Sequence, residues 1–456
     1  MALQGLRTQW GGIADAQSRP GKYFRIAQDG PVFWLVDPDG GRFLSKGVNS
    51  VRFDSDRIQN SDRIPHAEAC ERKYHSLAAW RETTVGRLSK WGFNTLGAWS
   101  DEALASTGSV PLALAPNLDL GMSHAWQRNE KNPNRAKQEF PDVFDPGFAY
   151  HVRARARDLC EDRNKNSSIL GWFIDNELRW GPDWRGSDEL LTLFLNLDAP
   201  SAGRSAAIGW LRARYVDFEK FNSVWRTSAL SWDMLESLQQ FHAPYRRKPI
   251  YECFTAEASV DYGDQRLAAF TADCDAFAAV IAERYFELTT AAIKAADANH
   301  LILGCRFAYN PSPAVIDIAG RYCDIISFNC YDRDASPLIE AYAAAGRPCL
   351  IGEFSFRAAD SGLPNTNGAG PLVATQAERA AGFRDYVTAA LQQRTVVGYH
   401  WFEYADQPAA GRFDGENSNF GAVTIEDEVY HELTRAMTVL NAEAEALHAA
   451  AAYALT

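Results

Sequence analysis

Two glutamates follow apolar segments at positions where carboxyl groups could do acid–base chemistry. Glu177 ends the segment GWFIDNE, and Glu353 directly follows the apolar segment CLIG. Two facing carboxyl groups can cleave a glycosidic bond, because one protonates the leaving oxygen while the other attacks the anomeric carbon. A gap of about 5 Å would give retention of configuration, and a gap of about 6.5–9.5 Å inversion. Asp175 competes with Glu177 for the acidic role, and a lone Glu is most simply a solvated loop residue.

Eight short apolar segments alternate with longer segments of helical period, and they would position both glutamates. The expected strands cover residues 43–49, 93–99, 110–115, 169–175, 301–306, 323–330, 349–354 and 396–402. This alternation predicts an α/β fold, a (β/α)8 TIM barrel, better than it predicts an open doubly wound sheet. The chemistry of such a barrel lies past the carboxyl ends of its strands, which is where Glu177 and Glu353 stand.

The chain is expected to divide into three stretches. Residues 1–42 hold an N-terminal segment and a β-hairpin, signalled by Asp29-Gly30, which packs on the barrel. Residues 43–428 form the catalytic barrel, with an inserted helical subdomain at about 185–263 between strands four and five. Residues 429–456 form a C-terminal helix on the barrel.

Composition excludes several classes of partner. The formal net charge of −12 argues against a polyanionic partner, because neutralising phosphates needs an excess of clustered Lys and Arg, so neither nucleic acid nor an anionic membrane is an expected partner. No run approaches the roughly 18 apolar residues of a membrane span. Aromatic residues make up 12% of the chain, and amphipathic rings in that abundance suit a cleft that stacks against sugar rings.

The cysteines and histidines show no metal-binding pattern. The 8 Cys include no CxxC pair, and the 9 His include no HExxH motif, so no metal site is expected. No Gly-rich turn with a nearby Lys follows the last strands, so no phosphate-bearing cofactor is expected either. Scattered cysteines indicate buried free thiols, and the N-terminus lacks a signal-peptide pattern, so the expected location is cytoplasmic, with a trimmed export signal as the alternative.

Several motifs carry a resemblance to known families. The segments FIDNE and LIGEFSF resemble the acid/base and nucleophile motifs of glycoside hydrolase clan A, whose members share a (β/α)8 barrel and a retaining mechanism. The segments KGVNSVRF, WGFNTLGAWSD, ILGWFIDNELRWG, HLILGCRF and GRFDGENSNFGAV resemble the β-agarase family, glycoside hydrolase family 50. A weaker likeness links them to barrel β-galactosidases, family 42. The likeness extends from Lys46 to Val423.

The resemblance implies roles for individual residues. It makes Glu177 the general acid/base and Glu353 the nucleophile, with Asn176 on the sugar 2-hydroxyl and Tyr331 against the nucleophile. Trp401 would form the aromatic floor under the sugar, or belong to the barrel core. Further candidates for substrate binding around the mouth are Asn49, Trp99, His124, Trp180, Arg306 and Glu403, and the turn-rich segment 412–421 is expected to be a substrate-side loop.

These observations predict a retaining β-glycoside hydrolase that binds a carbohydrate substrate and acts from the chain end on a galactose-containing, agarose-like oligosaccharide. A β-galactosidase, another β-glycosidase or a transglycosylase of the same clan is an alternative. So is a non-catalytic carbohydrate-binding barrel, which would keep the aromatic residues and need not keep both Glu. The inserted helical region could wall off one end of the cleft or form the interface of a homo-oligomer.

Overall fold

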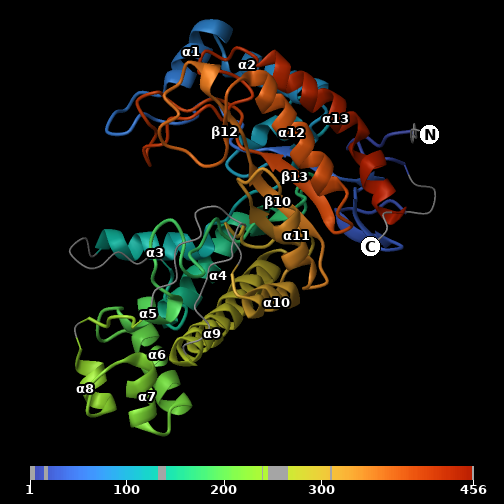
Figure 1. Ribbon diagram of the computed structural model, residues 1–456. Helices are drawn as coiled ribbons and strands as arrows, with labels where there is room; N and C mark the ends of the chain where they lie inside the picture. The colour runs from blue at the N-terminus through green and yellow to red at the C-terminus, as the bar shows by residue number, and fades with distance from the viewer. Residues whose placement is uncertain are drawn as a thin grey trace.

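The computed structural model describes residues 6–14, 19–131, 140–238, 240–244, 265–308 and 311–453 (Figure 1). Its chain has a mixed α/β fold with a parallel sheet. Cys253 and much of the second half of the predicted insertion lie outside the described residues. Within the described part, no helix combines the length and the hydropathy that crossing a bilayer requires.

The N-terminal region forms a three-stranded antiparallel sheet. β1 (Arg25–Asp29) and β2 (Val32–Val36) make the predicted hairpin, and β3 (Arg42–Phe43) pairs with β2 as a third strand. Gly30 sits in the tight turn with a φ of +57°, a left-handed conformation that favours glycine. This sheet packs against the interior of the parallel strands, because its side chains share one buried cluster with theirs; that cluster includes Trp10, Phe24, Leu35, Phe43, Leu170, Phe173, Leu303, Leu350 and Val397.

Six parallel strands form the main sheet, in the order β6-β5-β4-β13-β10-β9. Their bounds are β4 Ser45–Val48, β5 Thr95–Leu96, β6 Ala113–Leu114, β9 Ile326–Asn329, β10 Cys349–Phe354 and β13 Val396–Trp401. β7 (Gly171–Trp172) pairs in parallel with β8 (Leu301–Ile302). Isolated parallel bridges connect this pair to the main sheet, at Leu114–Ile169, Asn117–Phe173 and Phe307–Phe328. Each predicted strand region therefore contains a strand, shorter in most cases than predicted.

A 3-10 helix, Glu102–Ser106, lies between β5 and β6, and α-helices lie between the other successive parallel strands and after β13 (Figure 1). They are α1 Pro65–Tyr74, α2 Leu77–Lys90, α3 Leu120–Lys131, α4 Pro146–Cys160, α5 Leu190–Leu195, α6 Ala202–Arg214, α7 Phe218–Trp225, α8 Trp232–Ser237, α9 Gln265–Ala296, α10 Pro313–Tyr322, α11 Ser336–Ala343, α12 Gln376–Leu391 and α13 His431–Ala450. A short parallel pair, β11 (Arg357–Ala358) and β12 (Leu372–Val373), lies between β10 and α12. The predicted C-terminal helix corresponds to α13.

Side-chain caps explain several of the helix starts. The Ser76 hydroxyl accepts a hydrogen bond from the Ala79 amide at the start of α2, and Asp145 caps α4 just before a proline. Such caps pair amide groups that a helix leaves free in its first turn.

In Figure 1, α5 to α8 gather at the end of the molecule away from both termini. These helices fall between β7 and β8, where the insertion is predicted; its exact boundaries stay a prediction.

A buried ion pair joins β4 to α13. The Lys46 Nζ lies 2.6 Å from Glu445 Oε1, and their side chains are 5% and 1% exposed. Burial lowers the pKa of Lys46. For Glu445, burial alone would raise the pKa, but the charges and hydrogen bonds of Lys46 and Arg7 together outweigh it and the pKa falls. We predict that Glu445→Ala lowers the free energy of unfolding by about 3–5 kcal/mol, because it leaves a buried ammonium without its partner.

Urea denaturation at neutral pH measures this loss. The surface variant Glu68→Ala is the matched control, because its ion pair with Arg63 is largely exposed and should leave the midpoint nearly unchanged. A Glu445→Ala midpoint equal to that of Glu68→Ala would contradict the prediction. Lys46→Met combined with Glu445→Leu should recover much of the loss, since no charge then remains buried.

Candidate active site

One large cavity, of about 1000 Å³, opens past the carboxyl ends of the parallel strands. Residues that follow each of the eight strands line it. They include Ser50, Arg52, Ser55 and Asp56 after β4, Trp99 after β5, Asp119, Met122 and Trp126 after β6, Asn176, Glu177, Trp184 and Arg185 after β7, Ala308 after β8, Tyr331 and Asp332 after β9, Glu353 and 367–370 on or after β10, and Phe402, 412–414 and Glu416 after β13.

Glu177 reaches this cavity from the segment after β7. Its backbone has a φ of +51°, and its amide donates to the Arg306 carbonyl at 3.2 Å, so the turn is tied to the segment that follows β8. Burial, and then the charge of Glu353, raise the pKa of Glu177 to about 7, although a hydrogen bond from Asn329 opposes the shift. A carboxyl group with such a pKa keeps its proton near neutral pH, as a general acid must.

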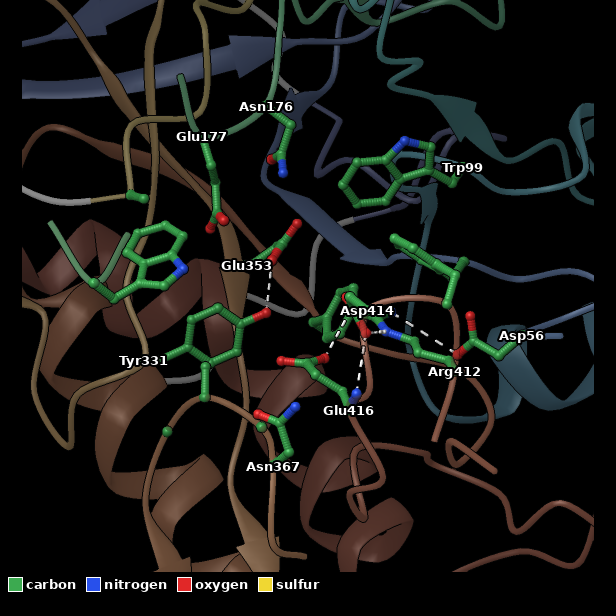
Figure 2. A pocket seen from close by; sticks show the side chains of 18 of the residues that line it. Asp56, Trp99, Asn176, Glu177, Tyr331, Glu353, Asn367, Arg412, Asp414 and Glu416 are labelled. Carbon is green, nitrogen blue, oxygen red and sulfur yellow. Dashed lines mark hydrogen bonds and ion pairs between the residues drawn. The ribbon is translucent and has the colours of Figure 1, made fainter. Parts of the chain in front are cut away.

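Glu353 lies near the end of β10, with its carboxyl group turned toward that of Glu177 (Figure 2). The Tyr331 hydroxyl donates to Oε2 of Glu353 at 2.6 Å. Arg306 pairs with Oε1 of Glu353 through Nη2. The guanidinium charge and the hydrogen bond both stabilise an ionised carboxylate, the form that a nucleophile needs. The structure thus brings the two predicted catalytic side chains together. The surroundings of Glu177 favour its protonated form, and those of Glu353 favour an ionised carboxylate.

Arg306, predicted to bind substrate, lies behind the cavity wall. It has no exposed surface and does not line the cavity. Its guanidinium lies 5.0 Å from the Trp99 ring centroid and 4.8 Å from that of Phe173. Its Nε donates to Oδ1 of Asn176 at 2.8 Å, while Nη2 holds Glu353. The expected sugar contact is corrected: Arg306 holds two cavity residues in place.

Of the two places expected for Trp401, the structure shows the core and not the floor of the cavity. Trp401 is fully buried, and its Nε1 donates to the Phe420 carbonyl at 3.0 Å. It packs against Phe354, outside the cavity. The next residue, Phe402, lines the cavity instead. Successive side chains of a strand point to opposite sides, so an error of one position replaces a cavity residue with a core residue.

Four other predicted substrate contacts do not line the cavity. Asn49 is buried, and its amide nitrogen donates to the Gly352 carbonyl. Trp180 is 4% exposed and stacks on Phe286, so it belongs to the core. His124 packs against Phe148 on α4, and burial lowers its pKa to about 4.

Glu403 is the fourth of these residues. It is 1% exposed, and its Oε1 lies 3.9 Å from Nη1 of Arg412. Burial and the nearby Asp56 raise its pKa well above the ordinary value. Glu403 therefore lies behind the cavity residue Arg412 and does not line the cavity itself. Trp99, Asn176 and Tyr331 do line the cavity, as predicted.

A cluster of charged residues at one side of the cavity, here called the Arg412 group, was not predicted from the ends of the strands. It consists of Arg412, Asp56, Asp414 and Glu416. Arg412 pairs with Glu416 at 2.7 Å and with Asp414 at 3.0 Å, and Asp56 lies 3.9 Å away (Figure 2). Arg412 and Glu416 come from the turn-rich segment 412–421, which reaches the cavity as expected. The segment 367–370, to which the sequence assigned no role, lines the same region. Asn329 was also missed, although it lies one position before the end of the predicted sixth strand, in SFNCY.

Asp175, the competitor for the acidic role, faces away from the cavity. It accepts hydrogen bonds from the Gly121 and Met122 amides at 2.7 and 2.9 Å and from the Tyr285 hydroxyl at 2.6 Å. Burial and the charge of Asp119 raise its pKa to about 7. Asp175 therefore holds the start of α3, which carries Met122 into the cavity.

Among the described residues, His66, Cys70 and Asp427 form a compact group of possible metal ligands, with ligand atoms within 4.8 Å of one another. The group lies outside the cavity. Asp427 is already paired with Arg87 at 2.8 Å, and burial raises the pKa of the Cys70 thiol to about 12. A cation would have to compete with the guanidinium and displace the thiol proton, so this arrangement suits a structural network.

Comparisons with known proteins agree on one kind of relative. No family model matches the chain. It is similar to β-agarase A of Vibrio sp. (strain JT0107), with 29% identity over 488 residues that cover 92% of this chain and 45% of the relative. It is also similar to β-agarase B of the same strain, with 26% identity over 501 residues that cover 95% of this chain and 50% of the relative. The chain thus spans about half the length of these curated relatives.

A solved structure shows the same fold. An exo-β-agarase superposes with a TM-score of 0.78 at 24% sequence identity, covering 97% of this chain and 67% of that one. Both of these sequence relatives and this structural neighbour are β-agarases, and the similarity extends over nearly the whole chain.

Proposed function

We propose that the protein is a retaining β-glycoside hydrolase that acts on agarose-like, galactose-containing saccharides, with Glu177 as general acid/base and Glu353 as nucleophile. The observation that carries the proposal is the pair of carboxyl groups turned toward each other in the cavity, one with a pKa raised to about 7 and the other paired with an arginine. These are the proton states that double displacement requires at neutral pH.

In the proposed first step, Glu353 attacks the anomeric carbon while Glu177 gives its proton to the leaving oxygen. A covalent glycosyl-enzyme forms, and the leaving saccharide departs as a neutral alcohol. In the second step Glu177, now a carboxylate, takes a proton from water, which attacks the same carbon and releases Glu353. Tyr331 would keep the nucleophile oriented, and Asn176 would hydrogen-bond the sugar 2-hydroxyl.

We further propose that the eight parallel strands close into a (β/α)8 barrel. The ladder of six strands, the β7–β8 pair and the parallel bridges between them support this reading. The convergence of residues from all eight strand ends on one cavity also supports it. We also propose membership of glycoside hydrolase family 50, which the similarity to β-agarases supports, and of clan A, in line with a barrel that carries both glutamates.

Agarose-like substrates are proposed because the relatives are β-agarases. Exo action is proposed because one structural neighbour is an exo-β-agarase. The cavity supports a saccharide ligand, since exposed aromatic side chains lie around it: Trp126 is 53% exposed, Trp184 46% and Phe413 77%. Rings of this kind present flat apolar faces on which sugars can stack.

The test is a substrate panel of neoagaro-oligosaccharides with aryl β-D-galactoside, glucoside and fucoside, followed by proton NMR of the first product. We expect cleavage of neoagaro-oligosaccharides from one chain end, with the β-anomer appearing first. Aryl galactoside as the better substrate would favour a β-galactosidase, and products longer than the substrate would indicate transglycosylation. Saccharide binding without any cleavage would overturn the proposal in favour of a carbohydrate-binding barrel.

A further inference from the structure

A continuous chain of hydrogen bonds links the two carboxyl groups of the cavity. From Glu353 it passes to Nη2 of Arg306, and from Nε of Arg306 to Oδ1 of Asn176 at 2.8 Å. The Nδ2 of Asn329 donates to the same Asn176 oxygen at 3.1 Å and to Oε1 of Glu177 at 2.9 Å. Three polar side chains therefore connect the nucleophile to the acid/base.

The chemistry of arginine sets the direction of every bond in this chain. A guanidinium only donates, so the Asn176 atom that faces Arg306 must be its oxygen. That oxygen then faces Asn329, which must turn its amide nitrogen toward it. The second hydrogen of the Asn329 nitrogen is left for Oε1 of Glu177. No alternative flip of either amide preserves these contacts, because it would set two acceptors or two donors against each other.

The packing around Asn329 holds it in this orientation. Asn329 is the last residue of β9 and is 1% exposed, and its backbone amide donates to the Phe307 carbonyl at 2.7 Å. Its Oδ1 is buried without a hydrogen-bond partner. A Cβ at Gly352 would lie 2.7 Å from that oxygen, so only glycine leaves room for it. The unpaired oxygen is costly, so the two hydrogen bonds of the nitrogen, to Asn176 and Glu177, must hold the amide in this orientation.

We propose that Asn329 is a positioning residue that keeps the catalytic proton of Glu177 on Oε2. Oε1 accepts from an N–H group, so a protonated Glu177 that carried its hydrogen on Oε1 would set that hydrogen against a donor. No described residue bonds to Oε2, which is left to face the bound saccharide. The inference rests on the proposed function, because it assigns the proton that this function transfers.

The same chain turns the amide nitrogen of Asn176 toward the cavity (Figure 2). Asn176 is therefore a hydrogen-bond donor toward a ligand, since its oxygen is occupied by Arg306 and Asn329. Loss of Asn329 removes one of the two groups that hold this orientation, and Arg306 remains as the other. Loss of Asn329 should therefore affect the proton position of Glu177 more than the orientation of Asn176.

The test compares two leaving groups in Asn329→Leu and Asn329→Ser. A saccharide leaving group needs protonation, whereas a dinitrophenolate leaves without it. With saccharide, we expect kcat/KM to fall about 10-fold to 100-fold, and with the dinitrophenyl glycoside of the same glycone less than about 3-fold. The basic limb of the saccharide pH profile should move to higher pH, because the Asn329 bond lowers the pKa of Glu177.

Asn441→Leu is the matched control, because it removes a buried Asn with two hydrogen bonds on α13, far from the cavity. It should lower thermal stability without changing the ratio of the two rates. Equal losses with both leaving groups in the Asn329 variants, or no loss with either, would overturn the inference. A wild-type protein that cleaves neither substrate would overturn the proposed function, and the inference with it.

Discussion

Replacing Glu353 with glycine is expected to lower kcat/KM for an agarose-like oligosaccharide by about 10⁴-fold or more. The substitution removes the atom proposed to bond to the anomeric carbon, and it leaves the guanidinium of Arg306 and the hydroxyl of Tyr331 without their acceptor. Water cannot substitute, since the proposed mechanism has no base on that face of the sugar. Steady-state kinetics with purified protein measures the loss.

Azide gives this prediction a readout beyond simple inactivation. The small anion should fit the space left by the Glu353 side chain and attack an activated β-glycoside directly. The product would then be an α-glycosyl azide, because one displacement inverts the configuration. The surface variant Glu432→Gln serves as a control for loss of an acidic residue and should keep full activity. Activity of Glu353→Gly within about 10-fold of the wild type would contradict the nucleophile assignment.

The two glutamates could be predicted because local sequence defines them. Each lies near the carboxyl end of a strongly apolar segment that forms a buried parallel strand, and the cavity opens at that end. The apolar pattern alone does not separate Glu177 from Asp175, and the resemblance of FIDNE to an acid/base motif made that choice. The apolar pattern also located the strands, because buried parallel strands are continuous apolar runs. It set their lengths less well: residues 301–306 read as one strand, yet β8 covers only Leu301–Ile302, and Arg306 has a φ of +50°.

Which polar residues contact a ligand could not be predicted, since that depends on tertiary packing. Arg306 stands at a strand end like Glu177, but the rings of Trp99 and Phe173 enclose it. Trp401 and Phe402 are both aromatic neighbours at the end of β13, and only the register of the strand decides which one lines the cavity.

Asn329 is a residue of the site that the sequence did not predict at all. A single Asn at a strand end carries no chemical signal by itself, and its role arises from contacts with Asn176 and Glu177, more than 150 positions earlier in the chain. The Arg412 group escapes sequence reasoning for the same reason, because Asp56 and Arg412 meet only when the loops after β4 and β13 fold against each other. Long-range pairings of this kind are visible only in three dimensions.

Replacing Glu177 with glutamine is expected to lower kcat/KM for saccharide leaving groups by about 10²–10⁴-fold. The neutral amide keeps the shape of the side chain and cannot donate the catalytic proton. The wild-type activity should fall as pH rises through about 7, where Glu177 loses its proton, and this basic limb should be absent in Glu177→Gln. An unchanged bell-shaped profile in the variant would remove Glu177 from the acid role.

The same substitution should change stability in a way that depends on pH. Burial and Glu353 raise the pKa of Glu177 from 4.5 to about 7, so between these values the folded chain binds a proton that the unfolded chain has released. Stability contributed by this group is therefore lost as pH rises through that window, and it stays low above 7. Glu177→Gln carries no such charge, so relative to wild type it should become more stable on passing from below pH 4.5 to above pH 7. Urea midpoints at the two ends of the window measure the difference, and an equal offset at both would mean that Glu177 titrates alike in the folded and unfolded chains, contrary to the proton state that the acid role requires.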